Sequence, residues 1–300
     1  MSDAPFDPAR CMRLARRLAT TIALAIGLGL GLGAHAQDAA TALRERHTGL
    51  ADKLAANQFK RPLHLESVQG SDNQRGDVFA VVPYPFAMIK RSMQGASQWC
   101  DILILHLNVK RCRVEAASAP TILSVSIGKK TEDVAADASK VDFAYRLAEN
   151  GPQYFQVLMS APAGPLGTRD YRIALEAVPL DAERSFLHMS YAYGYGMAAR
   201  LAMQAYLATV GANKVGFSTV GRTPEGKPVL VTGVRGVVER NTMRYYLAIE
   251  AYLASLALPA AEQTDKRIKD WFAATEEFAV QLHELPAADY IQMKRRETQP

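Results

Sequence analysis

The segment Val237–Leu258 constrains the fold most strongly, because it is the longest helical pattern after the N-terminal region. Its apolar residues recur at intervals of about three and four, which places them on one face of an α-helix. Asn241 or Thr242 can cap the start of this helix, and Pro259 ends it. The segment follows a long run of strand patterns. A sheet with one apolar face needs a cover, so we expect this helix to lie across the sheet.

Four consecutive segments alternate apolar and polar residues with a period of two. They are Val141–Leu147, Tyr154–Met159, Arg169–Val178 and Arg184–Tyr195. Such alternation is typical of an antiparallel sheet with one covered face and one face in water. Proline and glycine turns separate the segments. The sequence therefore predicts a meander of strands that ends shortly before the long helix.

Shorter elements are predicted on both sides of this meander. A hairpin joins Leu63–Val68 and Asp77–Val82 through the polar turn Gly70 to Gln74, and a second joins Lys214–Val220 and Pro228–Gly233. Helices are predicted for Gln37–Asn57, Phe86–Met93, Met197–Thr209 and Thr264–His283. Gln98–Leu105 fits either a strand or a turn of helix, and Leu107–Glu115 is extended. The basic tail Lys294 to Arg296 is expected in solvent.

The N-terminus has the pattern of a secretory signal peptide. Four arginines precede the apolar run Leu18–Gly33, and Ala34-His35-Ala36 is a small-x-small cleavage site. The apolar run approaches the length that spans a bilayer, so an uncleaved membrane anchor is the alternative. Alternating glycines weaken a stable helix and favour cleavage. We expect a periplasmic or secreted protein with no stable membrane span after cleavage.

Two cysteines follow the predicted leader, Cys100 and Cys112. We expect them to form a disulfide in an oxidising compartment, and two buried free thiols are the alternative. The formal net charge is +5, of which the first 36 residues contribute +2. The remaining basic bias is too weak to indicate a nucleic-acid partner.

Motifs of known catalytic or metal sites are not found in the sequence. The chain has no G-x-S-x-G elbow, no H-E-x-x-H pair and no phosphate-loop spacing. Gly194–Ala199 fits G-x-G-x-x-A, but the strands before it alternate as antiparallel strands do, so its glycines are interpreted as a strand-to-helix turn. We predict no catalytic residue, metal or cofactor, although an enzyme stays open because folding can bring distant residues together.

Tyrosines gather on the strand faces that are predicted to point inward. They are Tyr145, Tyr171, Tyr191, Tyr193 and Tyr195. Each buried hydroxyl needs a partner, so a tightly filled core would favour aliphatic residues instead. Ligand pockets combine apolar walls with a few polar groups. The group predicts a cavity between sheet and helix, with hydroxyls at the rim of the sheet as the alternative for any one residue.

The order of the predicted elements resembles the START-type, or SRPBCC-type, helix-grip fold. Arg169-Asp170-Tyr171 at a strand start is similar to the Arg-Asp-aromatic signature of START domains. The resemblance covers Arg61–Leu258. It implies an α+β fold in which a curved antiparallel sheet wraps around a long C-terminal helix and a lipid-sized cavity. It also implies that Arg169 and Asp170 are structural and that Tyr171 touches ligand.

The sequence departs from this family at three places. Some sterol-binding members carry a cavity arginine where this chain has Leu175, so a sterol is not specifically expected. The insertion Met197–Gly233 and the helical extension after Pro259 are also unusual.

Together these patterns predict four parts: a signal peptide at 1–36, an N-terminal helix at 37–60, a START-like domain at 61–258 and a C-terminal helical extension at 259–300. The predicted function is non-covalent binding of a hydrophobic small molecule or lipid by an exported protein. The candidate ligand-binding residues are Tyr145, Tyr171, Tyr191, Tyr193, Arg240, Arg244 and Leu247. Glu250 is a further candidate for orienting a polar head, with a surface or ion-paired role as the alternative. The alternative functions are an enzyme of the same fold, of cyclase or hydrolase type, and a structural envelope protein acting through its C-terminal helices. No protein partner is predicted.

Overall fold

The computed structural model describes residues 36–115, 120–129, 138–209 and 211–299. The predicted signal peptide therefore lies outside the described residues, apart from Ala36. Within these ranges one antiparallel sheet has the strand order β1-β2-β8-β7-β6-β5-β4-β3. Its strands are β1 Leu63–Gln69, β2 Asn73–Val82, β3 Val109–Glu115, β4 Ile122–Ile127, β5 Ser139–Asn150, β6 Phe155–Ala163, β7 Thr168–Pro179 and β8 Ser185–Tyr195. The four alternating segments are confirmed as β5 to β8, whereas β4 was not predicted.

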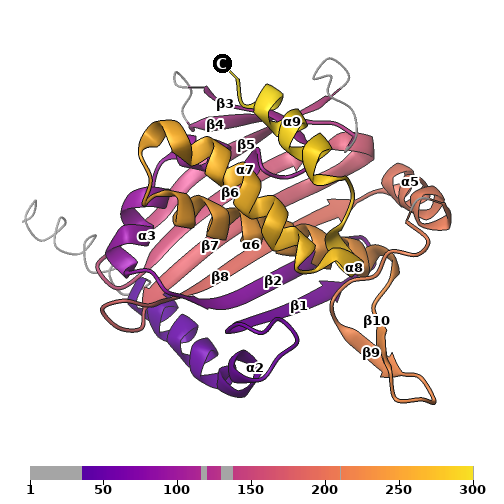
Figure 1. Ribbon diagram of the computed structural model, residues 1–300, viewed down its shortest axis with the longest axis horizontal. Helices are drawn as coiled ribbons and strands as arrows, with labels where there is room; N and C mark the ends of the chain where they lie inside the picture. Colours follow the sequence, from indigo (N-terminus) through magenta and orange to yellow (C-terminus); the bar gives the residue numbers. More distant parts are fainter. Residues whose placement is uncertain (1–35, 116–119, 130–137, 210, 300) are drawn as a thin grey trace, which may run out of the picture.

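Helix α6, Gly233–Ser255, crosses the inner face of this sheet (Figure 1). It contacts β1, β2 and β8 on one side and α7 on the other. The predicted α+β helix-grip fold is thereby confirmed. The helix begins four residues before Val237, so the predicted caps Asn241 and Thr242 were wrong. Thr242 lies inside α6, where its hydroxyl donates to the Val238 carbonyl at 2.8 Å.

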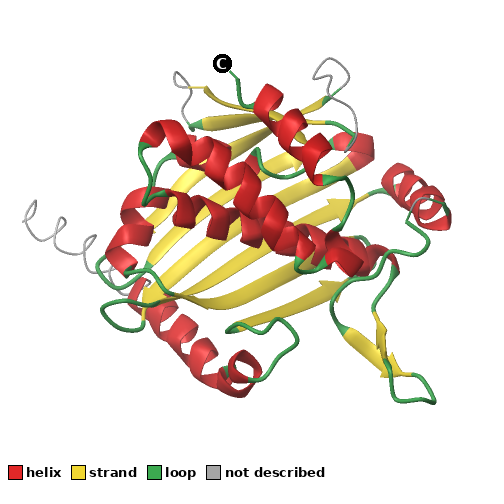
Figure 2. Cartoon of the chain, in the orientation of Figure 1, coloured by secondary structure: helices red, strands yellow, loops and turns green. Residues whose placement is uncertain are grey.

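Three further helices follow α6 (Figure 2): two of them contact its other side, and the last contacts α7, Ala260–Glu276. They are α7 Ala260–Glu276, α8 Ala279–Leu282 and α9 Ala287–Glu297. The single predicted helix Thr264–His283 is thus interrupted after Glu276. The prediction of a solvated tail was wrong for Lys294, which is fully buried. Its ammonium donates to the carbonyls of His106 and Val109 at 2.8 Å each, which fixes α9 against the start of β3.

Two short helices, α3 Phe86–Met93 and α4 Ala96–Leu103, lie between β2 and β3 in the chain. Phe86–Met93 matches its prediction, and the ambiguous segment Gln98–Leu105 is largely helical. A disulfide joins Cys100 of α4 to Cys112 of β3, as expected. It ties a helix to the last strand of the sheet.

The outer face of the sheet is covered in part, over β2 and β8, whereas Asp142 and Arg146 of β5 and Arg172 of β7 are exposed there, as expected. A helix that reaches residue 49 and α2, Ala51–Ala55, carry Leu43, Leu50 and Leu54. These side chains form a separate apolar cluster with Phe79 of β2 and Phe186 of β8. The N-terminal helix therefore forms a third layer. The sequence predicted this helix but not that its apolar residues pack on the outer face of the sheet.

A close contact between sheet and helix occurs at Gly76. A Cβ atom at this position would lie 3.0 Å from Cβ of Thr242 and would overlap its hydroxyl oxygen. Glycine is therefore required for α6 to approach β2 this closely. Beyond this contact, Met243 and Ile249 are almost fully buried. The middle of the helix is packed against the sheet, and free space is left toward the N-terminal end of α6.

We predict that Gly76→Ala destabilises the protein by about 1–3 kcal/mol, because the added methyl overpacks the contact with Thr242. The cost should be smaller in a Thr242→Ala background, where the overlapping hydroxyl is absent. Gly221→Ala is the control, because a Cβ atom there meets nothing within 4 Å. Urea unfolding of the four variants measures these differences. Equal costs for Gly76→Ala in both backgrounds would contradict the assigned contact.

Candidate functional site

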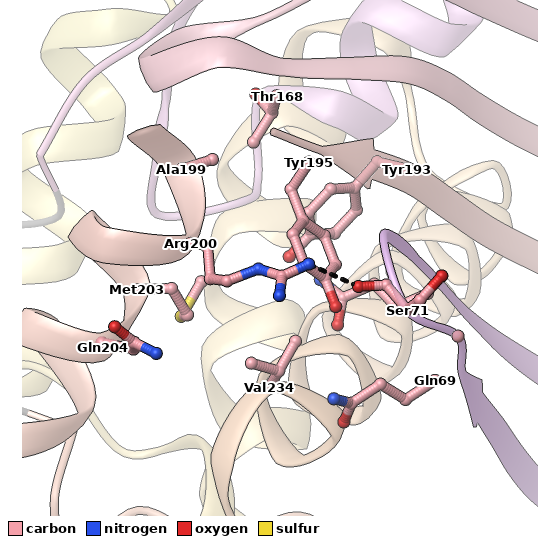
Figure 3. Close-up of a pocket in the computed structure, with 12 residues that line it drawn as sticks. Gln69, Ser71, Thr168, Tyr193, Tyr195, Ala199, Arg200, Met203, Gln204 and Val234 are labelled. Atoms are coloured by element: carbon pink, nitrogen blue, oxygen red, sulfur yellow. Dashed lines mark hydrogen bonds between the residues drawn. The ribbon is translucent and has the colours of Figure 1, made fainter. Parts of the chain in front are cut away.

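A cavity of about 320 Å³ lies at the N-terminal end of α6 (Figure 3). The turn between β1 and β2, the ends of β7 and β8, and helix α5, Met197–Ala208, surround it. Its walls include Gln74, Tyr193, Tyr195, Ala199, Met203 and Val234. Its volume is at the lower end of the usual range for ligand pockets. It would hold roughly ten water molecules at liquid density.

The sheet wall of the cavity is built from strand alternation. Gln74 of β2 lies directly opposite Tyr193 of β8. Gln74 alternates with Gly76 on the face toward α6, and Tyr193 alternates with Tyr191 and Tyr195. Gln74 and the three tyrosines are each more than nine-tenths buried. This row therefore forms an inner wall rather than a rim.

The tyrosines form a continuous aromatic cluster behind the cavity. Tyr193 stacks on Tyr171 with ring centroids 5.3 Å apart, and Tyr191 lies 5.5 Å from Tyr193. Tyr245 of α6 extends the cluster, 5.2 Å from Tyr191. The hydroxyl of Tyr171 donates to Thr168 at 2.8 Å. This cluster fills the space between the sheet and the middle of α6.

Burial sets the protonation of these phenols. It raises the pKa of Tyr191, Tyr193 and Tyr245, and neighbouring tyrosines add to the effect. Each group therefore stays neutral at physiological pH and can donate a hydrogen bond. Within the described part of the chain, the hydroxyl of Tyr193 has no hydrogen-bond partner. A ligand or water in the cavity can supply one.

Gln74 is the most unusual residue of the wall. It is 1% exposed, and neither its amide nitrogen nor its amide oxygen has a partner among the described residues. The sequence analysis missed it because it assigned Gly70 to Gln74 to a polar turn. The strand instead begins at Asn73, so Gln74 already points inward. A polar residue at the first inward position of an otherwise apolar strand was the signal that could have identified it.

Helix α5 covers the cavity with few buried contacts. Among its residues only Ala199 is buried, while Met197 and Leu201 are 70% and 59% exposed. Arg200 donates to the Ser71 carbonyl at 2.7 Å and holds α5 to the turn between β1 and β2 (Figure 3). Its guanidinium also lies over the ring of Tyr195. The sequence predicted this helix but not its position over a cavity.

The predicted site residues are only partly brought together. Tyr193 lines the cavity, and the rings of Tyr171 and Tyr191 contact the ring of Tyr193. Tyr145 lies elsewhere: its hydroxyl donates to the Gln94 carbonyl at 2.6 Å, and burial raises its pKa to about 12. Leu247 of α6 is fully buried in the hydrophobic core.

Arg240 and Arg244 face away from the cavity. Arg240 donates to the Val215 carbonyl at 3.2 Å, and Arg244 forms an ion pair with Glu284 at 2.8 Å. Burial lowers the pKa of Arg244, and the charge of Glu284 opposes that shift. Glu250 is likewise occupied, by Arg61 at 2.9 Å and by the hydroxyl of Tyr246 at 2.7 Å. The partners of these three residues lie in the insertion before α6, in the C-terminal segment, and at Arg61 and Tyr246, not in the cavity.

A second cluster of chemical groups lies on the outer face of the sheet. His188 is bound between Glu176 at 2.6 Å and Asp77 at 2.9 Å. Its ring stacks on Phe79, which belongs to the apolar cluster under the N-terminal helix. Burial lowers the pKa of His188, but the hydrogen bonds to the two carboxylates and their charges raise it to about 9. The protonated ring is thus an internal cross-link between β2, β7 and β8.

The described residues also limit two other kinds of site. They contain no group of three or more histidine, cysteine, aspartate or glutamate side chains placed to hold a metal ion. No described helix has both the length and the apolarity that crossing a bilayer needs.

Comparisons with known proteins concern the fold. No family model and no curated protein matches the chain. Among solved structures, norcoclaurine synthase from Thalictrum flavum matches at 15% identity over 50% of this chain and 80% of its own, with a TM-score of 0.32. Ara h 8.0201 matches at 12% identity over 64% of this chain and 99% of its own, with a TM-score of 0.35. A START superfamily protein from Mycobacterium smegmatis matches at 15% identity over 50% of this chain and 92% of its own, with a TM-score of 0.28. At these scores the likeness carries no argument about ligand or activity, and the helix-grip description rests on the sheet and α6 of this chain.

We predict that His188→Gln destabilises the protein by roughly 3 kcal/mol near pH 6, because the buried carboxylate of Asp77 and the partly buried carboxylate of Glu176 lose their cation. The folded pKa of about 9 exceeds the ordinary value of 6.5, so this stabilisation is complete below about pH 6.5 and is lost as the pH rises through 9. Burial raises the pKa values of Asp77 and Glu176, but the hydrogen bonds and charge of His188, together with Arg75 at Asp77 and Tyr154 at Glu176, outweigh it and lower both. Their contribution is lost in acid.

Chemical denaturation at pH 6 and pH 10 measures this effect. The difference between the wild type and His188→Gln should narrow markedly at pH 10. His283→Gln is the control, because His283 is half exposed and binds a single carboxylate, that of Glu276. An unchanged difference at both pH values would show that His188 stabilises the sheet by packing rather than by charge.

Proposed function

We propose that this chain is an exported protein, periplasmic or secreted, that binds a small hydrophobic ligand non-covalently in the cavity under α5. The observation that carries the proposal is a partly open cavity with apolar walls and unsatisfied polar groups. Tyr193, Tyr195, Met203 and Val234 supply apolar surface, and Gln74 supplies a free donor and acceptor. This combination is typical of small-molecule sites.

Apolar burial supplies the affinity in this proposal. Removing roughly 200 Å² of ligand surface from water contributes about 5 kcal/mol, before the costs of association are subtracted. Five kcal/mol corresponds to a Kd of about 0.2 mM, so a ligand of this size binds at submillimolar strength or more weakly unless polar contacts add to it. The sparse packing of α5 gives the ligand a way in without disturbing the core.

The make-up of the cavity wall favours binding over catalysis by the protein's own acids and bases. No aspartate, glutamate or histidine is found among the described residues that line it. Burial raises the pKa of Tyr193, so its phenol does not serve as a base at neutral pH. An enzyme of the same fold is the alternative, and turnover of a bound ligand would support it.

The C-terminal helices do not favour the structural alternative. Trp271 of α7 is 1% exposed, and its indole donates to the Arg244 carbonyl at 2.9 Å. Tyr290 of α9 stacks on it at 4.9 Å. The apolar stripes of these helices therefore pack inside the protein, against α6 and each other, and are not exposed for a partner to bind.

Export is supported by two features of the chain. One is the signal-like N-terminus, and the other is the disulfide between Cys100 and Cys112. Disulfides persist in oxidising compartments. Fractionation of the native host, with N-terminal sequencing of the protein recovered, tests this part. Recovery of the uncleaved chain from the membrane fraction would overturn it.

The ligand-binding proposal is tested by native mass spectrometry of the protein purified from its own host, followed by organic extraction. We expect a one-to-one adduct with a small apolar compound. A protein that is empty on purification and takes up none of a panel of small hydrophobic compounds would refute the proposal.

We predict that Ala199→Trp abolishes this adduct or weakens ligand uptake at least about tenfold, because the indole occupies the cavity. Ala205→Trp, at an exposed position of the same helix, should bind as the wild type does. Circular dichroism checks that both variants remain folded. Equal uptake by the two variants would place the ligand outside this cavity.

A further inference from the structure

We infer that the ligand ends in a neutral group that both donates and accepts a hydrogen bond, such as a carboxamide, and that Gln74 binds this end deep in the cavity. The inference rests on the ligand-binding function proposed above and specifies the chemistry that the site selects.

The first observation is the unsatisfied amide itself. Gln74 is 1% exposed, and both polar atoms of its side chain lack partners among the described residues. A buried donor or acceptor without a partner costs free energy, so native structures rarely keep one without a use. Here a donor and an acceptor lie side by side on one planar group. A second planar amide satisfies both at once through a pair of antiparallel hydrogen bonds.

The second observation is the distribution of charge around the cavity. Arg200 is the charged residue among the described lining residues, and it is exposed at the mouth, where Ser71 already accepts a hydrogen bond from it. Near Gln74 the neighbours are Tyr193 and Tyr195, both neutral. An ionised group placed there would be desolvated without a counter-charge. A carboxylate could accept a hydrogen bond from the amide nitrogen of Gln74 but would leave its amide oxygen without a donor.

The third observation is size. About 320 Å³ accommodates a compact ligand of one or two rings, whereas a two-chain phospholipid is several times larger. The aromatic faces of Tyr193 and Tyr195 suit flat rings, which stack on them. The ligand class is therefore a small aromatic or cyclic compound with a neutral amide-like end.

Three probes with the same ring system separate the effect of the head group. They are 2-naphthamide, 2-methylnaphthalene and 2-naphthoate. We expect the wild type to bind the amide about tenfold more tightly than the hydrocarbon, as one or two buried hydrogen bonds allow. The carboxylate should bind more weakly than the amide. Isothermal titration calorimetry at neutral pH measures all three dissociation constants.

Gln74→Leu tests the residue. The variant should lose the preference for the amide and keep its affinity for 2-methylnaphthalene within about twofold. Its melting temperature without ligand should rise by several degrees, because an unsatisfied donor and acceptor are removed. Gln69→Leu is the matched control: Gln69 also lines the cavity but is exposed, so the preference should persist.

Other results would overturn the inference in distinguishable ways. Equal binding of all three probes would remove the selective role of Gln74 and leave the ligand-binding function standing. Tightest binding of 2-naphthoate, lost in Arg200→Gln but kept in Gln74→Leu, would mean that an anion is recognised at the mouth. A lower melting temperature for Gln74→Leu without loss of preference would mean that Gln74 only holds structural water. Failure of every probe to bind would count against both proposals.

Discussion

The burial of α6 on both sides is the constraint on which the rest of the structure depends. The sheet covers one side, and α7 and α8 contact the other. Full burial forces the charged residues of α6 to find partners inside the protein. Glu239 accepts hydrogen bonds from the backbone of Phe217 and Ser218, and Arg244 binds Glu284. The segments around residues 217 and 284 therefore act as counterparts of α6, which accounts for both the insertion before this helix and the extension after it.

The sequence allowed the prediction of elements whose burial follows a simple period. Strands β5 to β8 and helix α3 obey such a period, and so does the existence of the long helix. Gln74 and Lys294 could not be placed, because each is a polar residue buried by long-range partners or by a cavity that no local pattern encodes. Arg240 and Arg244 were assigned to the cavity since they lie on the right helix, but Arg240 donates to Val215 in the insertion before α6, and Arg244 donates to Leu282 and Glu284 after it. Local periodicity determined the layers, and tertiary packing determined which side chains meet.

The site is built from two parts with different rigidity. The sheet wall is held by ladder hydrogen bonds and by contacts among the rings of Tyr171, Tyr191 and Tyr193. The opposite wall, α5, is held by few buried contacts and by the bond from Arg200 to Ser71. Low local packing density is typical of segments that open below the energy of global unfolding. The structure therefore combines a fixed recognition surface with a cover that can be displaced at low cost.

The contact between Gly76 and Thr242, with the tyrosine cluster beside it, closes the interior behind the cavity. A molecule that enters beneath α5 meets packed side chains at its far end and leaves by the way it came. Entry and exit of a ligand then use the same opening, so a second molecule binds only after the first has left. For the ligand binding proposed above, this geometry implies a cavity with a single opening rather than a channel.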